Sequence, residues 1–373
     1  MLLAILAVLQ QPAAAPAAPS PAAPSCVILD RLRDPAQTAP APVGGMLEQV
    51  EVLVMHDGVL LALLERVGHN FQSLGVDLFR STDRGEHWLR LQSLPSLAGA
   101  SLFERENGLF LIGSDEGPIV RCSEDHGETW SMPKNAVSGR ISTARLSGCS
   151  SPVEVCAGRI WKVFARCDAT SVSSVLVGSA AVGDDLLRAE NWSWSTELGA
   201  APWNRQPLGR SRLYSGEDHA PQLIVDAGGE WVDTSRPSEK GLRLQAPDPR
   251  PAWRGCGALG TRLLVDRARG LTLALAAFPD STRPPLPPAS LASEVDLMGT
   301  RDLAAWDVRT VLLRGDSGAR FDCADWAIDG EDLVAVIGGN LGETADSRAL
   351  LFLRVPAFRA RKFADAPARA PGG

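Results

Sequence analysis

The chain has 373 residues, 45% of them hydrophobic, and it carries a net charge of −7. That hydrophobic share is enough for a sizeable core and excludes a globally disordered chain. Positive and negative residues are interspersed without a basic block. The sequence therefore gives no support to nucleic-acid binding, which requires a concentrated positive patch.

The N-terminus has the features of an export signal followed by a spacer. Met1 to Leu9 is apolar, but it is shorter than the roughly 20 residues that cross a bilayer. Small residues at 13–15 offer cleavage sites, although no Lys or Arg precedes the apolar run. We expect a secreted or periplasmic protein with no membrane span in the mature chain. The alternative is an apolar tail without a targeting role.

Composition also divides the chain into three parts. Residues 11–25 are rich in Ala and Pro, which is typical of an extended linker. We expect a leader and linker over residues 1–25, one folded domain over residues 26–362, and a flexible tail over residues 363–373.

Seven cysteines occur, at positions 26, 122, 149, 156, 167, 256 and 323. In an exported protein, Cys149 with Cys156, or Cys156 with Cys167, could form a disulfide. No C-x-x-C pair exists and the five histidines are scattered, so the sequence predicts no metal site. We expect no cofactor, because neither a P-loop nor a dinucleotide-binding fingerprint occurs.

Short apolar runs separated by turns follow one another after residue 45. Val50 to Met55 and Val59 to Leu64 flank the turn His56-Asp57-Gly58, which predicts a β-hairpin. Similar pairs recur as far as Leu350 to Val355. Strands at this even spacing predict an all-β protein: a sandwich, a barrel or a propeller.

A repeated motif decides between these folds. The pattern Ser-x-Asp-x-Gly-x-x-Trp occurs at residues 81–88 and again at 123–130, an offset of 42 residues. Weaker copies lie at 300–306 and 184–192. A period of about 40–50 residues is that of a four-stranded propeller blade. We therefore expect a six-bladed β-propeller.

The motif itself has a structural chemistry. Its Ser and Asp side chains can accept hydrogen bonds from turn amides, and its Gly supplies a positive φ. Its Trp can pack beneath the turn. We interpret Asp83, Trp88, Asp125 and Trp130 as residues of the fold and not of a site.

The motif resembles the Asp-box of sialidases and their BNR-repeat relatives, and the likeness extends from about residue 45 to 360. The resemblance implies a six-bladed propeller and an exo-glycosidase. It also implies a Tyr nucleophile assisted by a Glu, an Asp acid/base, and three Arg that bind the sialate carboxylate.

Glu65 stands where the resemblance places the acid/base, after the apolar strand that precedes the first motif. A Glu in place of Asp is a departure from the family pattern. The alternative for Glu65 is a strand-end carboxylate that pairs with Arg66.

Tyr214 is the only tyrosine and therefore the candidate nucleophile, with Glu217 as its partner. The family's Tyr lies late in the chain, whereas Tyr214 lies in the middle. The alternative for Tyr214 is a packing residue with a satisfied hydroxyl.

Arg66, Arg159, Arg212 and Arg283 are the candidates for substrate binding. Family relatives often carry an Arg shortly before the segment that matches residues 296–298, but residues 289–293 contain none. A surface position is the alternative for each arginine. Further candidates are Arg210, Arg254 and Arg301.

Two functions follow from these residues. The first is a sialidase-like exo-glycosidase that acts on sialic-acid-type glycans, with a sialoside as ligand. The alternative is a catalytically silent Asp-box propeller that binds a glycan or a protein partner. The absence of a late Tyr favours the alternative.

Overall fold

The computed structural model describes residues 25–31, 49–67, 73–106, 108–149, 151–167, 172–199, 212–214, 222–226, 231–233, 262–266, 269–278, 294–301, 308–314, 320–341 and 348–358. Within these ranges no helix combines the length and the apolar composition that a membrane crossing requires.

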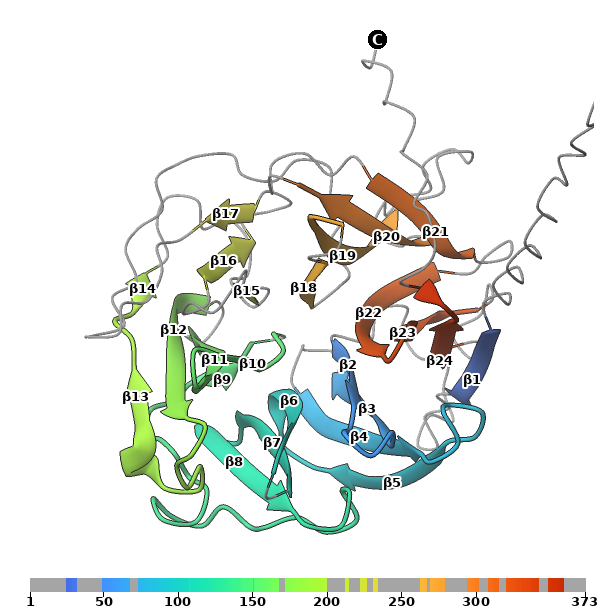
Figure 1. Cartoon of the computed structure of the whole chain (residues 1–373). Coiled ribbons are helices and arrows are strands. Elements are labelled where there is room, and N and C mark those ends of the chain that lie inside the picture. Colours follow the sequence, from blue (N-terminus) through green and yellow to red (C-terminus); the bar gives the residue numbers. More distant parts are fainter. Residues whose placement is uncertain are drawn as a thin grey trace, which may run out of the picture.

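The described strands form six antiparallel sheets arranged around a centre (Figure 1). The predicted all-β class and the propeller arrangement are confirmed, with at least five sheets standing as blades. The sheet of β15 to β17 has strands of only three to five residues. The number of six blades therefore stays a prediction.

In the first two sheets the first strand lies nearest the centre, and the later strands follow outward in chain order. The first contains β2 (Gln49–Val54), β3 (Leu60–Val67), β4 (Ser73–Ser81) and β5 (Leu89–Leu94). The second contains β6 (Ala98–Arg105), β7 (Gly108–Ser114) and β8 (Pro118–Ser123). The hairpin predicted around His56-Asp57-Gly58 is confirmed as the pair β2 and β3.

The next two sheets are less regular. The third has the order β10-β11-β12-β13, with β9 paired to β11 and β14 paired to β12. Its strands are β9 (Ser147–Gly148), β10 (Glu154–Cys156), β11 (Arg159–Cys167), β12 (Val172–Ala181), β13 (Trp192–Trp194) and β14 (Leu198–Gly199), with the 3₁₀ turn η1 (Ala189–Asn191) before β13. The fourth contains β15 (Arg212–Tyr214), β16 (Gln222–Asp226) and β17 (Trp231–Asp233).

The last two sheets complete the ring. The fifth contains β18 (Leu263–Asp266), β19 (Leu271–Phe278), β20 (Glu294–Thr300) and β21 (Val308–Arg314). The last contains β22 (Arg320–Asp329), β23 (Asp332–Asn340), β24 (Arg348–Val355) and, as its outermost strand, β1 (Ser25–Arg31). The strand that begins the described chain thus pairs with the one that ends it.

Apolar clusters fill the spaces between neighbouring sheets. One cluster joins Val50 and Phe79 of the first sheet to Val334 and Phe352 of the last. Others join the first sheet to the second, the second to the third, and the fifth to the last. A blade buried on both faces needs apolar residues on both sides of its strands, which explains the nearly continuous apolar run of β23.

The first copy of the repeated motif forms the turn between β4 and β5, and it satisfies its own polar groups. The Ser81 hydroxyl donates to Asp83 Oδ1 at 2.8 Å and accepts the Gly85 N–H at 2.8 Å. Asp83 Oδ1 accepts the His87 N–H at 2.9 Å, and Trp88 Nε1 donates to the Gly85 carbonyl at 3.1 Å. The turn therefore has the hydrogen bonds that the sequence predicts for the motif.

The second copy follows β8 and repeats the same four bonds. Ser123 to Asp125, the Gly127 N–H to Ser123, and the Thr129 N–H to Asp125 each measure 2.8 Å. The Trp130 ring donates to the Gly127 carbonyl at 3.1 Å. Both copies follow the third strand of their sheet, so the sequence period corresponds to one blade.

The two motif glycines differ in their surroundings. Gly85 has φ +92°, and a Cβ there would lie 2.1 Å from Phe352 Cε1 of β24. Gly127 has φ +89°, but the nearest atom to a Cβ there would be Leu91 Cδ1 at 3.3 Å, the end of a flexible side chain. Trp88 also packs on Phe352, with ring centroids 5.2 Å apart. The first motif therefore helps to join the first sheet to the last.

Alanine at each motif glycine separates the backbone cost from the packing cost. Gly85→Ala and Gly127→Ala both place a side chain at positive φ, which costs about 1–2 kcal/mol. Gly85→Ala must also displace Phe352, and such overpacking costs about 1–3 kcal/mol more. We expect the larger loss of unfolding free energy for Gly85→Ala in urea denaturation. Equal losses would mean that Phe352 relaxes without cost.

Candidate functional site

Glu65, the predicted acid/base, lies on β3 and is only 4% exposed. Its carboxylate accepts the N–H of Gly99 at 3.0 Å. Gly99 lies in a β-bulge of the second sheet, where the pairing of β6 with β7 shifts register. Opposite Glu65 on β2, the amide of Gln49 donates to the carbonyl of Ala100 in the same bulge at 2.9 Å. Glu65 and Gln49 therefore satisfy backbone groups that the bulge removes from the ladder.

The bulge has this form because Gly99 is a glycine. Its φ is +55°, and a Cβ would lie 2.0 Å from the carbonyl oxygen of Gly148 in β9. Only glycine allows the second and third sheets to approach so closely at this point. The position of Glu65 thus follows from the contact between sheets.

Arg66 belongs to a different environment. It is the next residue on β3, so its side chain lies on the opposite face from Glu65. Its Nε lies 3.2 Å from Asp77 Oδ2, and Arg90 Nη2 lies 2.9 Å from the same oxygen. Ser93 donates to the other Asp77 oxygen at 2.5 Å. Neither the predicted pair of Glu65 with Arg66 nor a shared site for the two is formed.

Arg159, the first residue of β11, is held within its own sheet. Its Nε donates to the Ser179 hydroxyl at 2.8 Å and its Nη2 donates to the Ser179 carbonyl at 3.2 Å. Its guanidinium carbon also lies 5.7 Å from the ring centroid of Trp161. These contacts give Arg159 a packing role, and a role in substrate binding stays a prediction.

Arg212 and Tyr214 lie on β15, the innermost strand of the fourth sheet (Figure 1). Tyr214 pairs with Gln222 and Arg212 pairs with Ile224. Their side chains fall outside the described part, so their roles stay predictions. Arg301 is exposed at the end of β20. Four other predicted residues lie outside the described ranges: Glu217, Arg283, Arg210 and Arg254.

A cluster of charged residues that the sequence did not predict lies among the inner strands. We call it the axial cluster: Glu51 of β2, Asp325 of β22, Glu154 of β10, and Arg262, which directly precedes β18. Arg262 Nη2 lies 3.5 Å from Glu51 Oε1 and 3.6 Å from Asp325 Oδ2. Glu154 adds a third carboxylate whose charge acts on Arg262.

The two buried acids of the axial cluster also bind the backbone of the neighbouring sheet. Asp325 Oδ2 accepts the Val52 N–H at 3.0 Å, which joins the last sheet to the first. Glu51 Oε2 accepts the Leu102 N–H at 3.1 Å, which joins the first sheet to the second. These two acids therefore connect successive blades near the axis.

Lys162 of β11 is fully buried beside these strands. Its ammonium group donates to the Ser101 hydroxyl at 2.7 Å, to the Cys149 carbonyl at 2.9 Å and to the Ser151 carbonyl. Three acceptors match its three protons. Burial lowers the pKa of Lys162 to about 8, and burial raises the pKa of Glu51 to about 8.

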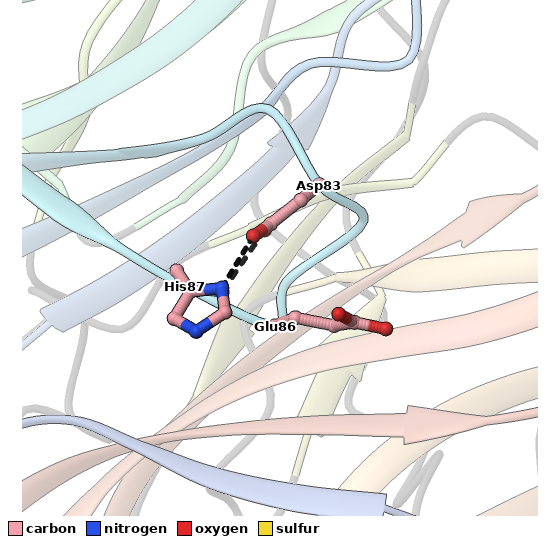
Figure 2. A group of neighbouring side chains, drawn as sticks. All are labelled: Asp83, Glu86 and His87. Carbon is pink, nitrogen blue, oxygen red and sulfur yellow. Dashed lines mark hydrogen bonds and ion pairs between the residues drawn. The ribbon is translucent and has the colours of Figure 1, made fainter.

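On the surface, Asp83, Glu86 and His87 bring potential ligand atoms within 4.8 Å of one another (Figure 2). His87 Nδ1 lies 2.6 Å from Asp83 Oδ2. Hydrogen bonds from the His87 N–H, the His87 ring and Ser81 lower the pKa of Asp83 to about 2. The turn itself accounts for this geometry, and we assign no metal to the group.

The sequence contains a signal for Glu51 of the axial cluster and for Lys162 that was not used. Glu51 stands between Val50 and Val52, and Lys162 stands between Trp161 and Val163. A charge inside an apolar strand is costly to bury unless it is paired, so such positions indicate internal partners. The sequence does not show which partners those are.

No family model matches the chain, and no curated protein matches it by sequence. Its structure is similar to that of Trypanosoma rangeli sialidase in complex with sialic acid, with a TM-score of 0.55 and 14% identity over 89% of this chain. The same sialidase with the inhibitor DANA gives 0.55 and 13% over 84%. The chain spans 59% and 55% of the length of those two sialidase chains.

A protein of unknown function from Dyadobacter fermentans DSM 18053 is also similar, with a TM-score of 0.57 and 13% identity. That match covers 88% of this chain and 98% of the other. At such identities the likeness concerns the fold alone. The chain has the fold of a sialidase-like β-propeller.

Two substitutions test the role of Glu65 in the bulge. Glu65→Gln keeps an oxygen that can accept the Gly99 N–H, whereas Glu65→Ala leaves that N–H buried without a partner. An unsatisfied buried donor costs about 1–3 kcal/mol. In urea denaturation we expect Glu65→Ala to lose at least that much stability and Glu65→Gln less than half as much. Equal losses would show that the charge of Glu65, and not its acceptor, is what matters.

Glu51 makes stability depend on pH. Its pKa is about 8 in the folded chain against an ordinary 4.5, so the folded state keeps a proton that the unfolded state releases. This stabilising contribution is complete below pH 4.5 and is lost as pH rises to about 8. Lys162 has a pKa of about 8 in the folded chain against an ordinary 10.5, so its own effect on stability lies between these two values, above the window of Glu51.

Glu51→Gln removes that titration. We therefore expect the stability of the wild-type chain relative to Glu51→Gln to fall steadily between about pH 5 and pH 8, as measured by urea denaturation at several pH values. A difference that stays constant with pH would show that Glu51 is ionised throughout.

Proposed function

We propose that the protein binds a glycan at the centre of the propeller, where the inner strands meet, without hydrolysing it through Glu65. Ligands bind by preference where several elements converge. The fold is shared with a sialidase whose complex with sialic acid is known. Arg262, at 23% side-chain exposure, offers a charged donor among the inner strands.

The burial of Glu65 carries the proposal. A general acid must come within hydrogen-bond reach of the glycosidic oxygen, directly or through one water. Glu65 is 4% exposed and its carboxylate already accepts the Gly99 N–H between two sheets. Moving it toward a substrate would leave that buried N–H without its acceptor. The most specific catalytic prediction therefore has no support from the position of Glu65.

A second candidate is the sialidase-like exo-glycosidase, with a sialoside as substrate. Tyr214 favours it, because the strand that carries this tyrosine is the innermost of its sheet. An arginine also stands at the beginning of three innermost strands. Arg212 is the first residue of β15, Arg262 directly precedes β18, and Arg320 is the first residue of β22. Export, as expected from the N-terminal sequence, would bring the chain to glycans outside the cell.

One pair of measurements separates the two candidates. The purified protein is incubated with a fluorogenic sialoside between about pH 4 and pH 8, and its binding is measured on a glycan array. Array binding without turnover is the expected result. Turnover that disappears in Tyr214→Phe but persists in Glu65→Gln would replace our proposal with the second candidate. The absence of both binding and turnover would refute both.

A further inference from the structure

The turn between β2 and β3 of the first sheet contacts charged groups of the second sheet at two points. Glu104 of β6 accepts the His56 N–H at 2.8 Å with one carboxylate oxygen, and its other oxygen contacts Nδ1 of the His56 ring. His126, in the turn after β8, places its Nε2 3.4 Å from Asp57 Oδ2. We call these four residues the joint cluster. Each of its histidines faces a carboxylate of the other sheet.

His126 occupies the fourth position of the second repeated motif, and Arg84 occupies that position in the first. Both residues have a positive φ, +58° for His126 and +62° for Arg84. Arg84 also reaches an acid at the first hairpin of the preceding sheet in the ring, because its Nη2 lies 3.2 Å from Asp332 Oδ2 where β23 begins. The two motifs therefore make the same contact, with a permanent charge in Arg84 and a titratable one in His126.

The net charge of the joint cluster changes near neutral pH. A histidine ordinarily gains its charge below about pH 6.5, whereas a carboxylate ordinarily keeps its charge down to about pH 5. In mild acid each charged ring attracts the carboxylate that it contacts. In mild alkali the rings are neutral, and the two carboxylates have no cation within the cluster.

Glu104 makes this effect strongest at His56. Its hydrogen bond and its charge raise the pKa of His56 above the ordinary 6.5, and the charge of Asp57 acts in the same direction, while desolvation opposes them. The folded chain therefore binds this proton more tightly than the unfolded chain does. The resulting stabilisation is complete below pH 6.5 and is lost as pH rises through the raised pKa.

We infer that the contact between the first and second sheets is pH-sensitive and that protonation of His56 and His126 strengthens it. The matching contact of Arg84, between the last sheet and the first, keeps its cation at every pH at which the chain is folded. The inference goes beyond the proposed function and does not depend on it.

Double-mutant cycles test the inference, because each cycle measures one pair apart from the rest of the chain and the titration of Glu51 cancels. One cycle combines His126→Gln with Asp57→Asn. The other combines His56→Gln with Glu104→Gln. Both acid replacements keep an oxygen that can accept a backbone N–H. Unfolding of the full chain in urea is measured at about pH 5.5 and about pH 8.5, on either side of the titration of histidine.

At the lower pH we expect each coupling to change the unfolding equilibrium constant by about two- to fivefold, the range of exposed ion pairs. At the higher pH we expect less than about 1.5-fold, because a neutral ring has no net charge to attract the acid. His126→Arg, which copies Arg84, should restore the coupling with Asp57 at the higher pH.

Arg80 and Glu128 provide the matched control. They cross the same contact between the first and second sheets, with Arg80 Nη2 2.8 Å from Glu128 Oε1. The cycle of Arg80→Gln with Glu128→Gln should give the same coupling at both pH values, because arginine keeps its charge throughout.

Histidine couplings that are equal at the two pH values, or absent at the lower one, would overturn the inference. It would also be overturned if the coupling of Arg80 with Glu128 changed with pH as much as theirs do. If a Glu104 variant does not fold, the cycle of His126 with Asp57 decides alone, because these side chains are 44% and 32% exposed.

Discussion

The propeller depends on hydrogen bonds that run from an acid on one inner strand to the backbone of the next. Asp325 binds the Val52 N–H and Glu51 binds the Leu102 N–H. Apolar packing between blades is strong but has no direction, so it does not by itself fix how far one blade slides along another. A carboxyl oxygen that accepts a single N–H fixes that register. Arg262 lies 3.5 Å from Glu51 and 3.6 Å from Asp325 and offsets part of the cost of burying these two acids.

The architecture was predictable because its signals are local. Alternating apolar runs and Gly-containing turns gave hairpins such as β2 with β3. The motif at residues 81–88 and 123–130 gave the length of a blade, since its polar groups are satisfied inside one turn. Closure of the ring by β1 was not predictable, because the pairing of Ser25 with Arg354 joins distant parts of the chain.

The centre of the molecule was less predictable, because its contacts join different sheets. Glu65 was chosen for its place before the first motif, but its partner Gly99 lies in a bulge that no spacing reveals. Glu51 and Lys162 were missed because a charged residue in an apolar run does not show which residue it will contact in the fold. The sequence shows on which strand a charged residue lies. The surroundings of that residue depend on the neighbouring sheet, which the sequence does not show.

The pairing of β1 with β24 has a practical consequence for handling the protein. The ring is closed by a ladder of hydrogen bonds and not by a peptide bond, and β1 is the outermost strand of its sheet (Figure 1). An affinity tag or a fusion partner joined just ahead of Ser25 would therefore leave from the outer edge of the ring and not over the inner strands. Deleting β1 would expose an edge strand of the last sheet, and such edges promote association between molecules.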